Sequence, residues 1–365
     1  MARTPEAPVT PAVLRWARED AGLAPADVAR VSGVAPAVAE AWESGAARPT
    51  LAQLRDLADA VRRPVAFFFS PDPPSEHGEL PLDFRSHEGA PSARLRREVR
   101  DAEERRAAYL DLVGRDITPW AVKIPDRAAI RDWLGVTLDV IQKTPDAGAA
   151  LTTWIAAVEA RGVLVFQMSR VPTAECRGFS LSRQVCPVIV LNGADAPAAR
   201  SFTLLHELAH LLDRQSGMCL LQEDVEVERR CNHTAAEVLL PGNAVTSSAR
   251  RFSGLDLVDS VVRDFRISAE VAAFRSRDLG LIDQAVVGHV LTRAAEAARR
   301  ATERATTGGP TQPVLLRRNL GDRYVAAVLD AMHAESISVT DATYLLDARV
   351  GTVERLQQAL AGTGR

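Results

Sequence analysis

The chain has 365 residues, 47% of them hydrophobic and 25% charged, which is enough for two or three domains with a substantial core. Its formal net charge of −3 gives no electrostatic reason to expect a polyanionic partner, and no apolar run reaches the roughly 18 residues of a membrane span. The start of the chain does not resemble a signal peptide and the four cysteines form no CxxC pair, so we expect a reduced, cytoplasmic protein without disulfides.

The first part of the chain, residues 8–72, is predicted to form an all-α helix-turn-helix domain. Four short helical segments follow one another, and a glycine turn at Gly33 separates the second from the third. The runs 42–45 (Trp-Glu-Ser-Gly) and 48–50 (Arg-Pro-Thr) resemble those of the XRE (Cro/repressor-like) domains. This resemblance implies a domain of the kind that regulates transcription.

The charges of this domain leave its partner open. Residues 1–72 contain eight Arg, no Lys and nine acidic side chains, so the segment is about neutral. The expected recognition helix opens with small apolar residues at 35–39, which offer DNA bases only methyl contacts. Direct DNA binding and a module reused for dimerisation or partner docking therefore remain alternatives. For DNA binding, the candidate phosphate contacts are Arg15, Arg30 and Arg48.

A Pro-rich linker is predicted at 73–92, and a charged connecting helix at 93–113 then opens the second domain, 93–299. Further helices are expected up to residue 160. Three short strands, at 162–166, 178–182 and 188–192, predict a small sheet. A small sheet beside an active-site helix is the arrangement in which zinc peptidases bind their substrate as an added strand.

The most informative motif is His206-Glu207-Leu208-Ala209-His210, in a helix that opens at Asp195-Ala196-Pro197. A spacing of four places both imidazoles on one helix face, where they can bind one Zn²⁺. Glu207 lies beside that face and could take a proton from metal-bound water and pass it to a leaving amine. The alternative is a pair of core histidines without a metal. That alternative would bury two ionisable rings and a carboxylate among leucines at a high cost in free energy.

A second helix, from residue 223 to Leu240, supplies the candidates for a third ligand. Positions 225, 231, 235 and 239 lie within about 60° of Glu228 around the helix axis and are apolar, so Glu228 is predicted to face inward. Glu226 and Glu237 fall on the opposite, solvent side. Asp224 shares the inner face but stands at the fraying start of the helix. Glu228 is therefore the predicted third ligand.

Two polar residues follow Glu228 on this helix. Asn232 lies one turn further along, where its amide could accept a hydrogen bond from a zinc-bound histidine and fix the tautomer of that ring. The alternative is a half-buried polar residue without a role. His233 falls about 140° from Glu228 around the helix and is expected at the surface.

The motifs of these two helices resemble those of the ImmA/IrrE metallopeptidases. The resemblance rests on the HELAH helix, Glu-x-x-Cys-Asn at 228–232 and Ala-Ala-Glu-Val-Leu-Leu-Pro at 235–241, and covers about residues 150–285. Cys231, Thr234 and Leu240 stand where that family usually has alanine, phenylalanine and methionine. The resemblance implies a gluzincin-like peptidase in which Glu207 is the base. Its one Zn²⁺, or Mn²⁺, would be bound by His206, His210 and Glu228.

The remainder of the chain returns to helices. A flexible connection is expected at 300–312, followed by a helical segment at 313–365, in which 337–352 suggests a further small helix-turn-helix-like unit. The predicted fold class is thus α+β and mostly helical: a helix-turn-helix domain, a peptidase domain with a small sheet, and a helical C-terminal segment.

These features predict a cytoplasmic zinc endopeptidase tethered to a helix-turn-helix domain. By family resemblance, its substrate would be a repressor or antitoxin-like regulator encoded nearby, cut to switch a stress, phage or mobile-element response. The alternative is a helix-turn-helix transcriptional regulator whose zinc site is structural or sensory. A structural zinc site does not need Glu207, so its presence favours the enzyme. The three tyrosines lie far from the motif in sequence, so no residue is assigned to stabilise an oxyanion.

Overall fold

In the computed structural model, the chain divides into two compact units, Met1–Asp101 and Ala102–Arg365. Most of the predicted linker at 73–92 lies outside the described residues, as do Asp224 and residues 304–311 between two helices. The structure describes residues 5–61, 63–73, 91–114, 119–120, 122, 124, 129–213, 225–303 and 312–363.

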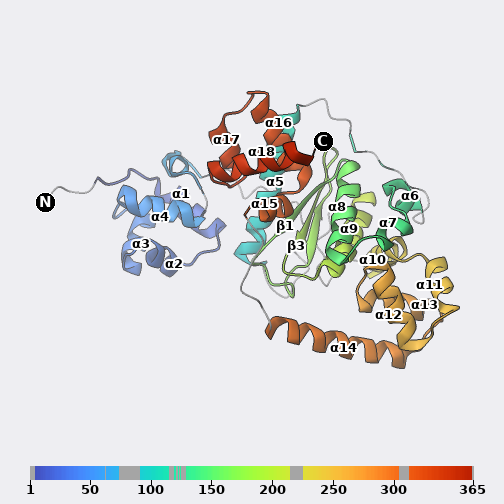
Figure 1. The fold of residues 1–365 in the computed structure, drawn as a ribbon. Coiled ribbons are helices and arrows are strands. Elements are labelled where there is room, and N and C mark those ends of the chain that lie inside the picture. Colours follow the sequence, from blue (N-terminus) through green and yellow to red (C-terminus); the bar gives the residue numbers. More distant parts are fainter. Residues whose placement is uncertain are drawn as a thin grey trace. The chain divides into compact units, whose positions relative to one another are not determined.

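The first unit contains the four helices that the sequence predicted (Figure 1). They are α1 (Pro11–Asp20), α2 (Pro25–Val31), α3 (Pro36–Ser44) and α4 (Leu51–Val61), followed by a 3-10 turn, η1 (Val65–Phe69). The first three begin with proline, whose fixed φ suits the first helical position and whose missing N–H is not needed there. Gly45 ends α3 in a left-handed conformation with a φ of 76°. Buried side chains such as Trp42 and Phe68 form one core in this helix-turn-helix region.

Helix α5 (Ala93–Val113) runs across the boundary between residues 101 and 102. In the second unit its Arg106 donates hydrogen bonds to the carbonyl oxygens of Val185 (2.7 Å) and Cys186 (3.0 Å). These bonds fix the later turns of α5 beside the segment that leads into the last strand of the sheet.

The second unit is built around a sheet of three short strands, β1 (Leu164–Met168), β2 (Gly178–Leu181) and β3 (Val188–Asn192). Their order is β1-β3-β2, with β1 parallel and β2 antiparallel to β3. Every strand residue is buried, so helices must cover the sheet. β1 begins two residues later than the sequence predicted, and the other two strands begin where they were expected.

Helices surround this sheet (Figure 1). α8 (Ala147–Ala160) and α9 (Pro197–Leu212) pack on each other and on the strands, and α10 (Val225–Leu239) packs along α9. One continuous apolar core joins them to most of the remaining helices. Those helices are α6 (Ile130–Leu134), α7 (Leu138–Gln142), α11 (Gly242–Ala249), α12 (Gly254–Phe265), α13 (Ala269–Asp278) and α14 (Gln284–Glu303).

The C-terminal segment adds α15 (Gln312–Leu320), α16 (Asp322–His333), α17 (Val339–Leu345) and α18 (Val350–Thr363). The corner between α15 and α16 covers the outer edge of β1. Leu164 N–H donates to Pro187 O and Met168 O accepts from Gly193 N–H, so the backbone of Val165 between them faces away from β3. Gly321, with a φ of 73°, lies against the carbonyl of Val165, where an added Cβ would come within 2.5 Å of that oxygen.

The mostly helical α+β architecture that the sequence predicted is therefore present. Within the described part of the chain, no helix combines the length and the apolar character that crossing a membrane requires.

Candidate metal centre

Helix α9 carries the His-Glu-Leu-Ala-His motif through the middle of the second unit. It begins with Pro197 at its first position, and every residue from Thr203 to Leu211 is buried. The side chains of His206, Glu207 and His210 are 1%, 0% and 0% exposed. Polar groups at this depth are costly unless they have polar or metal partners, so their surroundings indicate their role.

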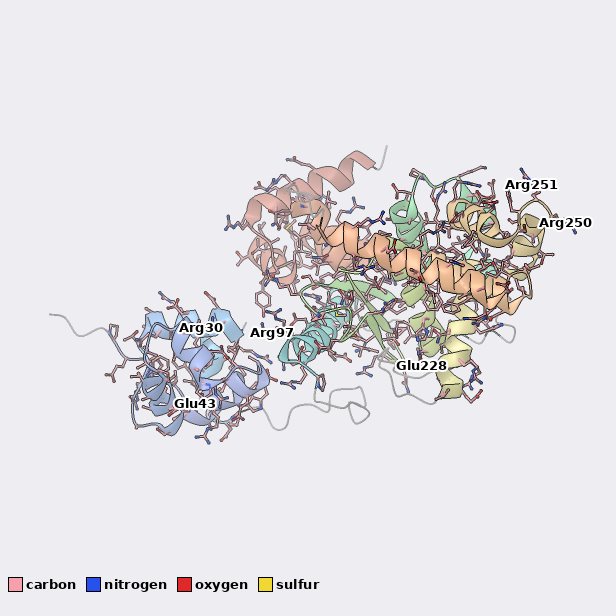
Figure 2. All side chains as sticks on the ribbon, turned by 90° about the horizontal axis from the view of Figure 1, so that it is seen from below. Arg30, Glu43, Arg97, Glu228, Arg250 and Arg251 are labelled. Atoms are coloured by element: carbon pink, nitrogen blue, oxygen red, sulfur yellow. The ribbon has the colours of Figure 1, made fainter. Side chains whose placement is uncertain are left out.

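Three side chains from α9 and α10 converge on one point. His206 Nε2 lies 3.0 Å from His210 Nε2, and the two nitrogens lie 3.3 Å and 3.1 Å from the two carboxylate oxygens of Glu228. Glu228, labelled in Figure 2, belongs to the first turn of α10. Its carboxylate reaches the histidines, and 23% of its side chain is exposed. The structure thus brings the three predicted ligands together, while their binding of a metal stays a prediction.

The spacing of these atoms fits a zinc ion. Zinc bonds of about 2.0–2.1 Å at tetrahedral angles place neighbouring ligand atoms about 3.3 Å apart, close to the observed separations. Two imidazoles and a carboxylate are also ligands that zinc takes in proteins. Among the residues that the structure describes, this is the one cluster of His, Cys, Asp or Glu with such a geometry.

The electrostatic environment of His210 favours a cation at this point. Burial alone would lower the pKa of His210, but hydrogen bonds with Cys231 and Glu228 and the nearby charge of Glu207 raise it to about 11. Cys231 is fully buried on α10. The groups around the ring therefore stabilise positive charge, whether a proton or a metal ion carries it.

Glu207 lies beside the three candidate ligands without belonging to them. Ser180 on β2 is the hydrogen-bonding side chain beside its carboxylate, and within the described residues no hydrogen bond of good geometry saturates either oxygen. Burial raises the pKa of Glu207, and the two histidines and the neighbouring Ser180 side chain counter part of that rise. A buried carboxyl with unused hydrogen-bonding capacity is suited to exchange a proton with a bound molecule.

Strand β2 passes directly over this part of α9. At Gly178 an added Cβ would lie 2.5 Å from Thr203 Cγ2 and 3.8 Å from Glu207 Cγ, so only glycine allows this approach. Asn192 N–H donates to Arg177 O, which directs the backbone of Arg177 toward β3 and that of Gly178 and Ser180 away from it. β2 therefore turns outward, next to Glu207, the backbone edge that is not paired with β3.

The inward face of α10 differs in part from the sequence prediction. Val225, expected inside, is 69% exposed, because the buried stripe runs through Val227 and Cys231 and leaves the first residue of the helix outside. Glu226 lies on the solvent side as expected. The prediction that Glu237 also faces solvent is wrong in part, because Glu237 is half-buried and forms an ion pair with the buried Arg275.

Asn232 and His233 both lie on the exposed side of α10 and line a cavity between α9, α10 and α13. No hydrogen bond joins Asn232 to either histidine within the described ranges, and His206 Nδ1 has no partner there. Asn232 and the two histidines therefore do not make the predicted contact that would fix the tautomer of a histidine ring. His233 is at the surface, as expected.

Two buried arginines that the sequence analysis missed hold the C-terminal end of α10. Arg131 donates to the carbonyl oxygens of Val238 (2.9 Å) and Leu239 (3.1 Å), and Arg275 donates to Leu240 O (3.3 Å). Burial lowers the pKa of Arg131 to about 10. Positive charge at a helix C-terminus binds carbonyls that lack partners in the helix. The only sequence signal for Arg131 was its place between Ile130 and Leu134 in an apolar helix.

The three candidate DNA contacts are exposed on the first unit and do not form a cluster of free cations. Arg15 donates to Glu43 O (3.1 Å), and Arg30 is paired with Asp27 (2.6 Å; Arg30 is labelled in Figure 2). Arg48 has no acidic partner within the part of the chain that the structure describes. The exposed side of α3 carries Ala37, Val38 and Glu40, so the recognition helix supplies no basic side chain.

Comparison with protein-family models identifies both domains. Residues 158–277 match the IrrE N-terminal-like domain of peptidase family M78, and residues 12–66 match a helix-turn-helix domain. The chain therefore carries a helix-turn-helix domain followed by a peptidase domain, in the order that the motifs indicated. The comparison with curated proteins found no similar protein.

Proposed function

We propose that this chain, with its IrrE-like peptidase domain, is a zinc-dependent endopeptidase that cuts a regulatory protein. His206, His210 and Glu228 would hold one Zn²⁺, with Mn²⁺ as a substitute, and Glu207 is the general base. The observation that carries the proposal is the convergence of three side chains, whose polar atoms lie 3.0–3.3 Å from one another, beside the fully buried carboxyl of Glu207.

A bound zinc would supply Lewis acidity, which polarises a peptide carbonyl and makes water a better nucleophile. Glu207 accepts the proton of the attacking water at a carboxylate oxygen and delivers it to the nitrogen of the leaving amine. Its burial supports this double role, since a pKa above the usual range for glutamate brings proton uptake and release closer in free energy. Leu204, Leu205 and Leu208 surround the motif with apolar side chains, which limit the access of bulk water.

The edge of β2 is the proposed binding site for the substrate backbone. The N–H and C=O of Ser180 face away from β3, so an extended peptide can pair with them as a fourth strand. The Ser180 side chain also lies close enough to Glu207 to affect its pKa. A peptide held on this edge would therefore pass beside the base.

The helix-turn-helix domain supports a regulatory substrate. We propose that the target is a helix-turn-helix repressor or an antitoxin-like protein encoded nearby, whose cleavage switches a stress, phage or mobile-element response. The domain would bring the peptidase to that partner or to its DNA. Phosphate contacts by Arg15, Arg30 and Arg48 belong to this proposal.

The test is the Glu207→Gln variant, co-expressed with helix-turn-helix proteins encoded beside the gene. Removing a positioned general base typically costs about 10²–10⁴ in rate, so cleavage should nearly vanish while bound zinc stays at the wild-type level. Glu226→Gln is the matched control, because Glu226 is an exposed carboxylate on α10. Equal cleavage by the Glu207→Gln variant and wild type would refute Glu207 as base. Absence of cleavage by all three proteins, with zinc bound, would favour a regulator with a structural or sensory zinc site.

A further inference from the structure

A cavity of about 560 Å³ opens between α9, α10 and α13 in the second unit. We infer that it receives a large apolar side chain of the peptide substrate, next to the bond that is cut. The inference rests on the proposed function and adds a substrate preference to it. The volume lies within the range of about 300–1,000 Å³ that is usual for ligand pockets.

The cavity adjoins the cluster of His206, His210 and Glu228. Phe202, in its wall, lies one helical turn before His206, and the two ring centroids are 6.2 Å apart. Asn232, also in its wall, lies one turn after Glu228 on α10. One turn is about 5.4 Å, and successive residues of an extended peptide are about 3.3 Å apart. A substrate with its carbonyl at the cluster can therefore place a neighbouring side chain in the cavity.

Apolar side chains from three helices are part of the cavity lining. Phe202 and Ala199 come from α9, Ala236 from α10, and Val271 and Phe274 from α13. Phe274 is 39% exposed although it is aromatic and lies beside the cavity. Burying an apolar side chain against these residues gains free energy in proportion to the area removed from water.

The charged side chains of the cavity do not favour an anionic ligand. Each of its four arginines is paired with a carboxylate: Arg177 with Asp195 (3.8 Å), Arg229 with Glu226 (2.9 Å), Arg277 with Asp278 (2.7 Å), and Arg275 with Glu237. The guanidinium of Arg277 also lies over the Phe274 ring, 5.1 Å from its centroid. Glu270 on the rim has no cationic partner in the described part of the chain and would repel an acidic side chain.

The experiment measures binding, so that it does not depend on cleavage. Peptide hydroxamates whose side chain next to the zinc-binding group is benzyl, isobutyl, methyl or carboxyethyl are titrated calorimetrically into the zinc-loaded full chain. We expect the benzyl and isobutyl compounds to bind about 10- to 100-fold more tightly than the methyl compound. The carboxyethyl compound should be the weakest. Equal affinities, or no binding of any hydroxamate, would overturn the inference.

Two variants assign the preference to this cavity. Phe274→Ala removes an exposed wall, and Ala236→Leu fills the space from α10. Each should reduce the preference for benzyl over methyl several-fold and leave the affinity of the methyl compound nearly unchanged. Phe252→Ala is the control, because Phe252 lines a different cavity, beside α11 and α12. Loss of the preference in Phe252→Ala, or its retention in both cavity variants, would contradict the assignment. A clear preference without cleavage of any candidate protein would support the cavity and count against the peptidase.

Discussion

The candidate functional side chains of the two units lie in opposite environments. In the second unit, His206, His210 and Glu228 come from two helices and point at one another in a largely buried position. In the helix-turn-helix unit, Arg15 and Arg30 are exposed and bonded to groups of their own unit, and the recognition helix supplies no basic side chain. Side chains that converge on one point define what the site can bind chemically, whereas a helix-turn-helix fold alone does not define its partner. The residues of the second unit therefore define a chemical function more narrowly than those of the helix-turn-helix unit define a nucleic-acid contact.

The largest effect is expected from removal of the proposed third ligand, Glu228. Glu228→Ala leaves two histidines, and the affinity for zinc should fall on the order of 10³-fold, because structural and catalytic sites gain most of their binding from complete coordination. Competition with a zinc chelator of known affinity measures the change. Glu226→Ala, two residues earlier and exposed, should bind zinc like the wild type. If Glu228→Ala kept its affinity and Glu226→Ala lost it, the ligand assignment would be wrong.

A second prediction concerns the buried cation that holds α10. Arg131→Met leaves the carbonyl oxygens of Val238 and Leu239 without their donor, which should lower the free energy of unfolding by about 3 kcal/mol. Chemical denaturation measures the loss. Arg250→Met is the control, because Arg250 is exposed at the end of α11 (Figure 2) and should change stability by less than about 0.5 kcal/mol. Similar losses in both variants would contradict a special role for Arg131.

A pH-dependent stability is expected from Glu159 on α8. Burial raises its pKa to about 8, from 4.5. Because the folded chain holds the proton more tightly than the unfolded chain, stability falls as the pH rises from 4.5 to about 8 and then levels off. Glu159→Gln should remove this part of the decline, on the order of 4 kcal/mol at pH 8.5, and change little at pH 5. Calorimetric melting at both pH values measures this change in stability. Glu296→Gln is the control, because Glu296 is exposed. If the stability of wild type and Glu159→Gln fell in parallel with rising pH, Glu159 would be excluded as the source of the decline.

The smallest expected effect lies in the first unit. If residues 8–72 bind DNA through phosphates, Arg48→Ala should weaken binding a few-fold for all sequences and reduce the slope against the logarithm of salt concentration by about 1. Fluorescence anisotropy at several salt concentrations measures both. Binding that does not depend on salt, or no binding while a protein partner is retained, would instead indicate a docking module.

The sequence predicted the helices and strands of the site well, because periodicity and end signals are local. It also singled out Glu228 from its competitors, since the apolar stripe of α10 is visible in the order of residues. It failed where the outcome depended on a distant partner. Glu237 is half-buried because it forms an ion pair with Arg275, which lies on another helix. Arg131 could not be told from the many exposed arginines, and the order β1-β3-β2 cannot be seen in the spacing of the strands.

The covered edge of β1 has a consequence for stoichiometry. The corner at Gly321 lies against the outer edge of β1, and β3 is paired on both sides, so β2 has the one strand edge of the described sheet that an added peptide can use. A chain that binds substrate by strand addition can then hold a single extended peptide at a time. Uncut substrate, cleaved product and a strand-mimicking inhibitor would all compete for that edge. Product inhibition should accordingly be competitive, and turnover should depend on how fast the cleaved strand leaves.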